Sequence, residues 1–598
     1  LFLLSFKTHA QVISGQISKI GDATHLQWSG RSEWFYDDPV KEGTRWTFAL
    51  PAFDQDTEKR LSEAKKFVKS GTKIVDPADA VGLLETVIKP GDRVSIEGDN
   101  QKQANFLAKC FAKVSPAKVN NIHMVQSVLA LPEHLDVFDK GIASKVDFCY
   151  SGPVATRLAN MVMSGKITIG AIHTYMELFA RTYLDLTPRV CLVAANAADK
   201  EGNLYTGFNT EETHSIIEAT KFRKGIVVVQ VNQIVNKVPR VDIPGGWVDF
   251  IIPTEDPYYI EPLFTRDPRL ITESQIFIAM MALVGVYAKY EVKTLNHGIG
   301  FNTAAAELLL PTFGEEMGLK GKICTHWALN PHPTMIPAIE SGWAESFMPF
   351  GSEVGMEKYI MARPDIFPIG PDGTMRSNRV MSQAAGHYAV DAFFGSTLQI
   401  DQFGNSAAAT AGRIPGFGGA PNMACNAPGR RHPSKGWLMA SEEDGMRESL
   451  IGPINRGRKL VVQMVETFGE GMAPVFVEKL DAFKLQAQAK FPIPPIMIYG
   501  DDITHIVTEE GIAYIHKCKS LKERMDAIKA IAGYTPLGLA ADEAQTKKLR
   551  KAGIVALPED LDLSFNDAKR SKLAAKSMSE LVEWSGGLYE PPVKFRNW

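Results

Sequence analysis

The stretch GIVVVQVN, residues 225–232, decides the fold class of this chain. It carries β-branched, apolar residues on both faces of an extended backbone, which is typical of a strand buried within a parallel sheet. Three stretches of similar character precede it: VNNIHMVQS (119–127), KVDFCYSG (145–152) and RVCLVAANAA (189–198). Because helical patterns lie between these strands, the sequence predicts an α/β domain with a mainly parallel sheet.

A second series of strands and helices follows the first. The stretch LNHGIGFNTAAAELLLPTF (295–313) predicts a Gly loop that leads into a helix, and strands are expected near KICTHWAL (322–329) and DAFFGSTLQID (391–401). Its start resembles the earlier stretch GDNQKQANFLAKCF, which predicts a helix over 100–114. The similar starts indicate two related α/β domains joined near residue 290.

The length of 598 residues exceeds what one hydrophobic core usually holds and favours two or three domains. The predicted parts are an N-terminal extension at 1–45, a first α/β domain at 46–290, a second at 291–541 and a helical C-terminal tail at 542–598. The stretch 271–292 predicts the helix with which the second series of elements begins.

Composition excludes several classes of protein. Hydrophobic residues make up 45% and charged residues 22%, as in a globular enzyme, and a net charge of -3 argues against a nucleic-acid partner. The six cysteines include no CxxC pair, so we expect reduced thiols and a cytoplasmic location. No window holds about eighteen uninterrupted apolar residues, so we expect no membrane span.

One carboxylate stands out by its setting. In HPTMIPAIESGW (332–343) an apolar run ends in Glu340, and a Ser-Gly turn follows at once. The stretch predicts either a solvated glutamate at the end of a strand or a carboxylate held at the mouth of a pocket. In a dry pocket such a group can act as a nucleophile, an acid or a base.

A Gly-rich segment and a basic cluster lie further along, in RIPGFGGAPNMACNAPGRR (413–431). Glycines permit close approach of a ligand, and their N–H groups can stabilise an oxyanion. A flexible turn without a function would have the same kind of sequence. The cations that follow could bind a phosphate or a carboxylate, or form a solvated surface. They are Arg430, Arg431 and Lys435.

Other kinds of site find little support. Gln230 and Asn232 end a predicted strand, where amides either bind a ligand or cap the strand. There is no G-x-S-x-G nucleophile elbow, no HExxH zinc motif and no P-loop. We therefore predict no metal site.

Several stretches together resemble one known family. LNHGIGFNTAAAELL, AIESGW, QIDQFGNSAAA and PGFGGAPNMACNAPG follow one another as in the second domain of family I coenzyme A transferases. KPGDRVSIEGDNQKQA and VVVQVNQIVNKVPRVDIPGGWVDFII resemble the first domain of the same family. The resemblance covers roughly residues 70 to 530. It implies two related coenzyme A transferase-type α/β domains with mainly parallel sheets and the active site between them.

Within this superfamily, SIEGDNQKQANFLA, NPHPTMIPAIESGW and GFGGAPNMACNAPGRRHPSKGW resemble the α subunits of malonate decarboxylases. The resemblance implies an enzyme that exchanges the thiol of an acyl carrier protein between acetyl-thioester and malonate, giving malonyl-thioester and acetate. It implies no tightly bound cofactor, the thiol substrate being acyl-coenzyme A or a carrier-linked phosphoribosyl-dephospho-coenzyme A. The implied partners are the carrier protein and the decarboxylase subunits.

The same resemblance implies roles for individual residues. In family I transferases a glutamate before a Ser-Gly or related turn attacks the acyl-thioester, and here that residue is Glu340. An oxyanion donor is expected at Gly418 or Gly419, with Asn405 close to the acyl oxygen. Substrate or coenzyme A binding is expected at Gly98, Asn100, Gln101, Asn232, Gly298, Gly300, Gly416, Arg430, Arg431 and Lys435. Gln230 stands where many transferases carry glutamate, which breaks the family pattern.

Three alternatives stay open at this point. The acceptor carboxylate could attack the acetyl-thioester directly, with Glu340 only positioning it. The chain could also be a free-standing coenzyme A transferase or hydrolase for another short acid. A third alternative is a scaffold that binds acyl-thioesters without turnover.

Overall fold

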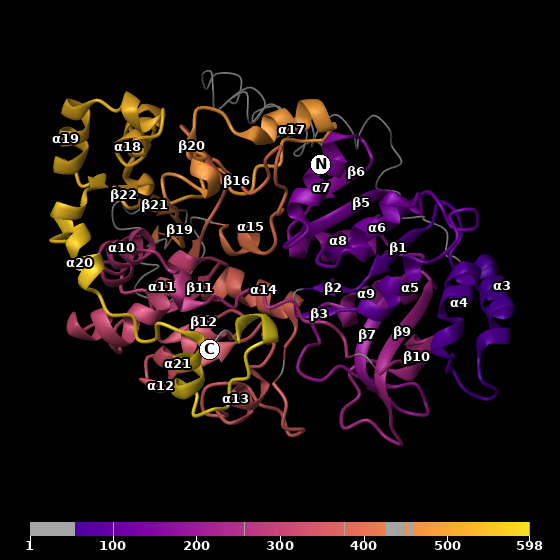
Figure 1. Ribbon diagram of the computed structural model, residues 1–598. Coiled ribbons are helices and arrows are strands. Elements are labelled where there is room, and N and C mark those ends of the chain that lie inside the picture. The colour runs from indigo at the N-terminus through magenta and orange to yellow at the C-terminus, as the bar shows by residue number, and fades with distance from the viewer. Residues whose placement is uncertain are drawn as a thin grey trace.

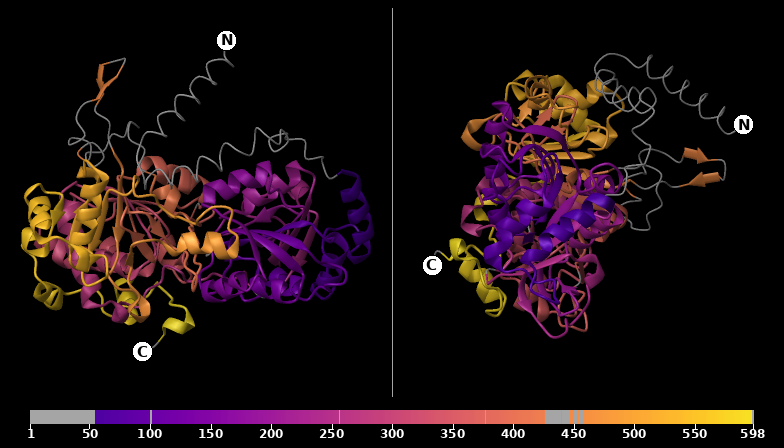
Figure 2. Two further views of the ribbon diagram at one scale, coloured as in Figure 1. Left: turned by 90° about the horizontal axis from the view of Figure 1, so that it is seen from above. Right: turned by 90° about the vertical axis from the view of Figure 1, so that its right-hand side faces the viewer.

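Two α/β domains lie side by side in the computed structural model, each built on its own eight-stranded sheet (Figures 1 and 2). The predicted fold class is therefore confirmed. The residues that the structure describes are 54–99, 101–255, 257–375, 377–425, 439, 447–449, 452–454 and 458–596. The predicted extension at 1–45 lies outside them.

The first sheet has the strand order β10-β9-β7-β1-β4-β5-β6, and every pair along this path is parallel. Its strands are β1 (Arg93–Ile96), β4 (Ile122–Val128), β5 (Ala143–Tyr150), β6 (Thr168–Ile172), β7 (Val190–Ala198), β9 (Ile226–Ile234) and β10 (Phe250–Pro253), with β8 (Leu204–Tyr205) antiparallel on β7. The four stretches that predicted buried strands correspond to β4, β5, β7 and β9.

The second sheet has the order β13-β12-β11-β14-β19-β21-β22-β23, parallel up to β21 and antiparallel beyond it. Its strands are β11 (Thr294–His297), β12 (His326–Ala328), β13 (Ser346–Met348), β14 (Ala392–Gly395), β19 (Leu460–Met464), β21 (His505–Thr508), β22 (Gly511–Tyr514) and β23 (Val555–Ala556). Strand β23 comes from the segment that was predicted as a helical tail, so this segment also completes the sheet.

Helices pack on both sheets (Figure 1). Those of the first domain are α3 (Asp54–Ala64), α4 (Ala80–Val87), α5 (Asn105–Phe111), α6 (Glu133–Asp139), α7 (Ala155–Met163), α8 (Tyr175–Leu184) and α9 (Thr213–Phe222). Those of the second half of the chain are α10 (Glu273–Ala282), α11 (Phe301–Leu309), α12 (Ile336–Glu340), α13 (Glu357–Met361), α14 (Arg379–Ala389), α15 (Ala420–Met423), α17 (Asp481–Ala489), α18 (Leu521–Ala530), α19 (Glu543–Lys551), α20 (Phe565–Arg570) and α21 (Met578–Trp584).

One local prediction differs from the structure. The helix predicted over 100–114 begins only at Asn105, because a short hairpin of β2 (Gly98–Asp99) and β3 (Lys102–Gln103) precedes it. The helix predicted over 271–292, at the start of the second series, does form, and it packs in the core of the second domain. Its residues are apolar all round, so its own sequence does not select which sheet it covers.

The stretch that ends in Glu340 is helical rather than a strand end. A 3₁₀ turn over Pro333–Met335 leads into α12, and a proline stands in the first turn of each, where no backbone N–H is needed. Residues 336–339 are buried, and Glu340 is exposed at the last position. Helix α12 packs against α21 at the outer part of the second domain (Figure 1).

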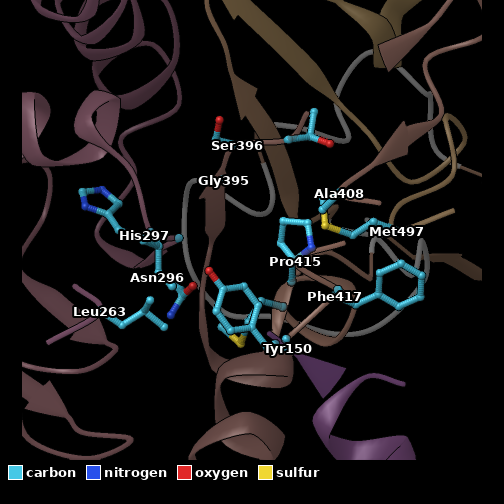
Figure 3. Close-up of a pocket in the computed structure, with 18 of the residues that line it drawn as sticks. Tyr150, Leu263, Asn296, His297, Gly395, Ser396, Ala408, Pro415, Phe417 and Met497 are labelled. Carbon is cyan, nitrogen blue, oxygen red and sulfur yellow. The ribbon is translucent and has the colours of Figure 1, made fainter. Parts of the chain in front are cut away.

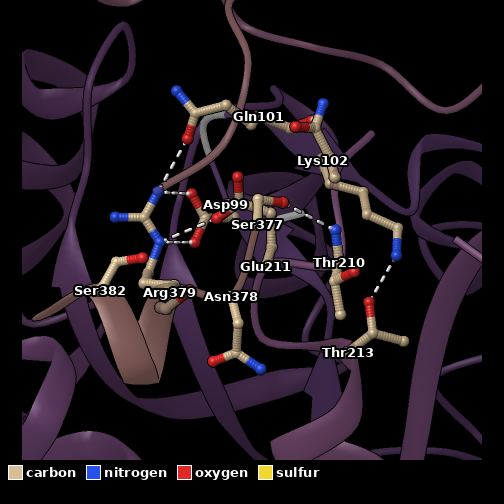
Figure 4. A network of polar contacts seen from close by, with 12 residues as sticks. Asp99, Gln101, Lys102, Thr210, Glu211, Thr213, Ser377, Asn378, Arg379 and Ser382 are labelled. Atoms are coloured by element: carbon tan, nitrogen blue, oxygen red, sulfur yellow. Dashed lines mark hydrogen bonds and ion pairs between the residues drawn. The ribbon is translucent and has the colours of Figure 1, made fainter. Parts of the chain in front are cut away.

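A buried ion-pair network joins the two domains (Figure 4). Arg379, at the start of α14, pairs with Asp99 and Glu211 of the first domain. Its Nε donates to Oε2 of Glu211 at 2.9 Å, and its Nη2 donates to Oε1 of Gln101 at 2.7 Å. All four side chains are buried, so the second domain inserts a cation into an acidic patch of the first.

Charge and burial act together in this network. Burial, and then the charge of Asp99, raise the pKa of Glu211 well above its usual range. Burial alone would lower the pKa of Arg379, but Asp99 and Glu211 outweigh it and raise that pKa. A Cβ on Gly351 would lie 1.8 Å from Oε1 of Glu211, so the lack of a side chain there lets the domains meet. The arginine is what makes the buried carboxylates tolerable.

We expect Arg379→Met to lower the free energy of unfolding by about 3–5 kcal/mol, because it leaves buried carboxylates without their cation. Arg363→Met is the matched control, since Arg363 pairs with the half-exposed Glu340 at the surface. That change should cost less than about 1 kcal/mol. Urea unfolding of both variants measures the difference, and equal losses would contradict a cross-domain role for Arg379.

Candidate active site

A cavity of about 300 Å³ opens between the two domains (Figure 3). Tyr150 reaches it from the carboxyl end of β5, and Asn296 and His297 reach it from the carboxyl end of β11. Ligands of open α/β sheets bind at this edge. The connection between the domains and the Gly-rich segment supply further walls, from within residues 263–266 and 413–420. We therefore take this cavity as the candidate active site.

The Gly-rich segment is fastened across the domain boundary. Gly416 and Gly418 have φ angles of 85° and 57°, which favour glycine. A Cβ on Gly416 would lie 2.5 Å from the carbonyl oxygen of Cys149. The N–H groups of Phe417 and Gly418 donate to that same oxygen at 2.7 and 2.9 Å. A loop of the second domain is thus bonded to β5 of the first.

Of the two predicted oxyanion donors, Gly419 is better placed than Gly418. The N–H of Gly418 is already bonded to Cys149. The N–H of Gly419, which precedes α15, has no acceptor within the described ranges. A Cβ on Gly419 would lie 2.4 Å from Nε2 of Gln383, so glycine lets this amide approach the cavity.

Arg266 is the cation that best fits an anionic substrate. It lines the cavity from the connection between the domains, with its guanidinium 5.4 Å from the centre of the Phe301 ring. Its Nη1 donates to the carbonyl oxygens of Leu263 at 2.6 Å and Thr265 at 3.0 Å. Burial lowers the pKa of Arg266, and no described carboxylate forms an ion pair with it. A carboxylate of a bound ligand would therefore find a partly desolvated cation.

A buried acid stiffens the floor of the cavity. The carboxylate of Glu307 lies 2.8 Å from Nδ1 of His297 and 2.9 Å from Nε2 of His332. The hydroxyl of Tyr287 lies 2.7 Å from Nε2 of His297. Burial would raise the pKa of Glu307, but His332 and His297 outweigh it and hold that pKa well below its usual range. Both nitrogens of His297 are thus engaged, and the ring is fixed behind Asn296.

Glu340 does not come to this cavity. Its Oε1 accepts a hydrogen bond from the Tyr359 hydroxyl at 2.6 Å and forms an ion pair with Arg363. The side chain is 31% exposed and is not among the residues that line the cavity. The structure therefore separates the predicted nucleophile from the predicted Gly-rich loop.

The other predicted residues divide into two groups. Gly298, Gly416, Gly418 and Gly419 line the cavity together. The remaining described positions do not: Gly98, Gln101, Asn232, Gly300 and Asn405. Asn100, Arg430, Arg431 and Lys435 lie outside the described residues.

Each residue of the second group has a local setting of its own. Asn405 donates through Nδ2 to Asp401 at 2.9 Å and accepts from the N–H of Gly500 at 3.0 Å, which holds a turn. Asn232 lines a second cavity of about 770 Å³. Gln230, beside it on β9, accepts from the N–H of Leu107 and so caps α5. Gly98 and Gln101 belong to the hairpin under Arg379, and Gly300 precedes α11.

Sequence reasoning missed Arg266, Arg379 and Tyr150. Tyr150 ends a stretch that was predicted as a strand, so the rule that ligands bind at strand ends could have found it. Arg266 and Arg379 lie in no motif. Among the described residues, no group of three His, Cys, Asp or Glu side chains is arranged to hold a metal ion. None of the described helices has the length and apolar character needed to cross a bilayer.

The fold and site define a two-domain α/β protein with a ligand cavity at the domain boundary. Residues 51–598 match the family described as malonate decarboxylase, alpha subunit, transporter. This chain belongs to the malonate decarboxylase α-subunit family.

Relatives agree with this assignment. The acetyl-S-ACP:malonate ACP transferase of Malonomonas rubra is 61% identical over 543 residues, which cover 91% of this chain and 98% of that protein. A Pseudomonas malonate decarboxylase hetero-tetramer, solved with malonate, contains a chain that is 54% identical, with a TM-score of 0.87 and coverage of 91% and 98%. The malonate decarboxylase α subunit of Acinetobacter baumannii is 51% identical, with a TM-score of 0.85 and coverage of 90% and 98%.

We expect Gly416→Ala to lower the free energy of unfolding by about 2–3 kcal/mol, since the new Cβ overlaps a backbone oxygen and must adopt a positive φ. Gly412→Ala, on the same segment, is the control, because its Cβ would meet no atom within 4 Å. It should change stability by less than about 0.5 kcal/mol. Denaturant titration of both variants decides the matter, and a tolerated Gly416→Ala would show that the loop is not held to β5 as described.

Proposed function

We propose that this chain exchanges the thiol of an acyl carrier protein between acetyl-thioester and malonate. The observation that carries the proposal is Arg266, a half-buried cation without a described carboxylate partner, in the same cavity as the Gly419 amide. Malonate has two carboxylates, and burying the second one without a cation would be costly. The 61% identity to the Malonomonas rubra transferase supports the same substrates.

The proposed chemistry needs no side-chain nucleophile. One carboxylate oxygen of malonate attacks the acetyl carbonyl carbon, the C–S bond breaks, and the carrier leaves as a thiolate. Acetate and malonate are then joined as a mixed anhydride. The thiolate attacks the malonyl carbonyl carbon, the C–O bond breaks, and acetate leaves. No proton is gained or lost over the two steps.

The residues of the cavity have distinct roles in this scheme. Arg266 binds the carboxylate of malonate that does not react. The N–H of Gly419 donates to the oxyanion that forms on the attacked carbonyl. Asn296 and the neighbouring His297, whose ring is held by Glu307, shape the wall that excludes water from the anhydride. Glu340 remains at the surface as the partner of Arg363.

The thiol substrate and the partners follow from the family. We propose that the thiol belongs to a carrier protein with a phosphoribosyl-dephospho-coenzyme A arm, and that free coenzyme A is a weaker substitute. The malonate decarboxylase hetero-tetramer of Pseudomonas supports assembly with carrier and decarboxylase subunits. All six cysteines are free, which favours a cytoplasmic location.

We expect Arg266→Met to raise the KM for malonate by roughly 10- to 100-fold, because a charge-assisted hydrogen bond is lost. The measurement is transfer of labelled malonate into thioester by the holoenzyme complex. Exchange of labelled acetate with acetyl-thioester is the internal control, since acetate has no second carboxylate. An equal loss with both acids would contradict the assignment of Arg266 to the distal carboxylate.

We expect Glu340→Gln to keep most of the wild-type turnover, because that side chain lies outside the cavity. The same assay with borohydride reduction tests for a glutamyl thioester. Loss of exchange in Glu340→Gln, with inactivation by borohydride in the wild type, would restore the covalent route.

The main alternative is a free-standing coenzyme A transferase or hydrolase for another short acid. Acetate, malonate, succinate and butyrate, offered singly to the wild-type chain, separate the two functions. A preference for succinate or butyrate over malonate would overturn the proposal.

A further inference from the structure

Glu353 is a buried carboxylate that the proposed chemistry does not use. It lies in the loop between β13 and α13, and its side chain is fully buried. Its Oε1 accepts from the N–H of Phe264 at 3.1 Å, and its Oε2 accepts from the hydroxyl of Thr265 at 3.2 Å. Nε2 of Gln101 lies at the outer limit of a hydrogen bond, 3.4 Å from Oε1.

These donors link Arg266 and Arg379, two of the arginines that line the cavity. Phe264 and Thr265 directly precede Arg266 in the connection between the domains. Gln101 reaches Glu353 through its amide nitrogen and receives Nη2 of Arg379 through its amide oxygen. Glu353 therefore lies between the cation that joins the domains and the cation that faces the ligand.

The position of Arg266 depends on this short segment. Among the described residues, its Nη1 is bonded only to carbonyl oxygens of the segment itself, those of Leu263 and Thr265. The guanidinium therefore moves with residues 263–265. Those residues are held to the second domain by the carboxylate of Glu353, which accepts from two of them. An ionised carboxylate can accept hydrogen bonds from both donors through its two oxygens. A neutral carboxyl or an amide has less capacity to accept, because one of its two polar groups carries hydrogen.

We propose that Glu353 is the positioning residue that holds Arg266 at the distal carboxylate of malonate, and so sets the preference for a dicarboxylate over acetate. This inference rests on the proposed function. Glu353 acts through the backbone and hydroxyl of its neighbours and touches no substrate.

The charge of Glu353 gives the proposal a signature in pH. Burial raises the pKa of Glu353 to about 7, against the opposing effects of the Phe264 N–H, His332, Thr265 and Arg266. The charged and titratable groups that face it are Arg266 on the connection, His332 after β12 and Tyr589 on the C-terminal segment. The ionised, accepting form gains population as the pH rises through about 7. The KM for malonate should therefore fall over that range.

The pH dependence of the folding stability runs in the opposite direction to that of malonate binding. Because the folded-state pKa lies above the ordinary value of about 4.3, the folded protein binds the proton more tightly than the unfolded chain. The stability from that proton is full at low pH and is lost as the pH rises through about 7. Improved malonate binding with rising pH therefore does not reflect a more stable protein.

The experiment compares Glu353→Gln with wild type in the holoenzyme complex, with malonate and acetate exchange measured from pH 6 to 8.5. We expect Glu353→Gln to raise the KM for malonate by roughly 10-fold or more through misplacement of Arg266, with a far smaller change in kcat. The KM for acetate should stay within about threefold, as for a site without a direct role. The pH dependence of malonate KM that wild type shows near 7 should be absent. The ionisation of malonate itself is common to both proteins and cancels.

Two further variants make the test specific. Glu357→Gln neutralises another glutamate that is partly buried. Burial also raises the pKa of Glu357, but this residue lines the second cavity and not the first. It should leave both KM values unchanged. Thr265→Val removes one donor and keeps the charge of Glu353. It should raise the KM for malonate severalfold with the pH dependence retained, and it stands in for Glu353→Gln if that variant does not fold.

The possible results distinguish a failure of the positioning role from a failure of the proposed function. If wild type does not exchange malonate, the proposed function fails. If wild type exchanges malonate but the Glu353 variant keeps its KM and its pH profile, only the positioning role is overturned. A loss of kcat with both acids and an unchanged KM for malonate would overturn it as well, because Glu353 would then act on the transfer itself.

Discussion

The pairing of Arg379 with Asp99 and Glu211 is the constraint on which the rest of the structure depends. It brings a cation from α14 into a buried acidic patch of the other domain, so any arrangement of the two domains must keep these charges together. The guanidinium also lies over the ring of Tyr175, 4.5 Å from its centre, at the wall of the cavity. The same contact that joins the domains therefore sets the width of the space between them.

Two other buried carboxylates, Glu97 and Glu307, are balanced by groups close to them. Glu97 is paired with Lys102 beneath the hairpin, with no exposure of either side chain. Glu307 is shared by two histidines under the floor. Such groups lose their hydration on folding, and only well-aligned partners compensate for that loss. Small displacements of these groups are therefore costly in free energy. A reaction that forms an anhydride benefits from fixed walls that keep water away from it.

The fold could be predicted from the sequence because most of its strands and helices have a characteristic local pattern of apolar residues. Runs such as IVVV on β9 are apolar on both faces, and this property belongs to the strand itself. Helix α10 is apolar all round and could cover either sheet, so it was its place in the chain, and not its own pattern, that indicated the second domain. The location of Glu340 could not be predicted from its own stretch, because the side of α12 that faces solvent depends on α21 and Tyr359, which are distant in sequence.

The candidate site was predictable only in part. The glycines of the loop were found because a tight backbone path needs that residue type. Arg266 was not found, because its suitability for an anionic ligand depends on its burial and on the lack of an ion pair with any described carboxylate, and no single stretch of sequence shows either. Gln230 and Asn405 carried plausible amides, yet both serve to close local structure.

The segment between the domains is part of the cavity wall and not only a tether. Leu263, Phe264 and Arg266 line the site from it. Engineers who build chimaeras by exchanging whole domains usually cut at such a connection. Here that cut would pass through the recognition surface, so a domain taken from a relative would arrive with an incomplete pocket. The natural unit of exchange is the second domain together with residues 254–272.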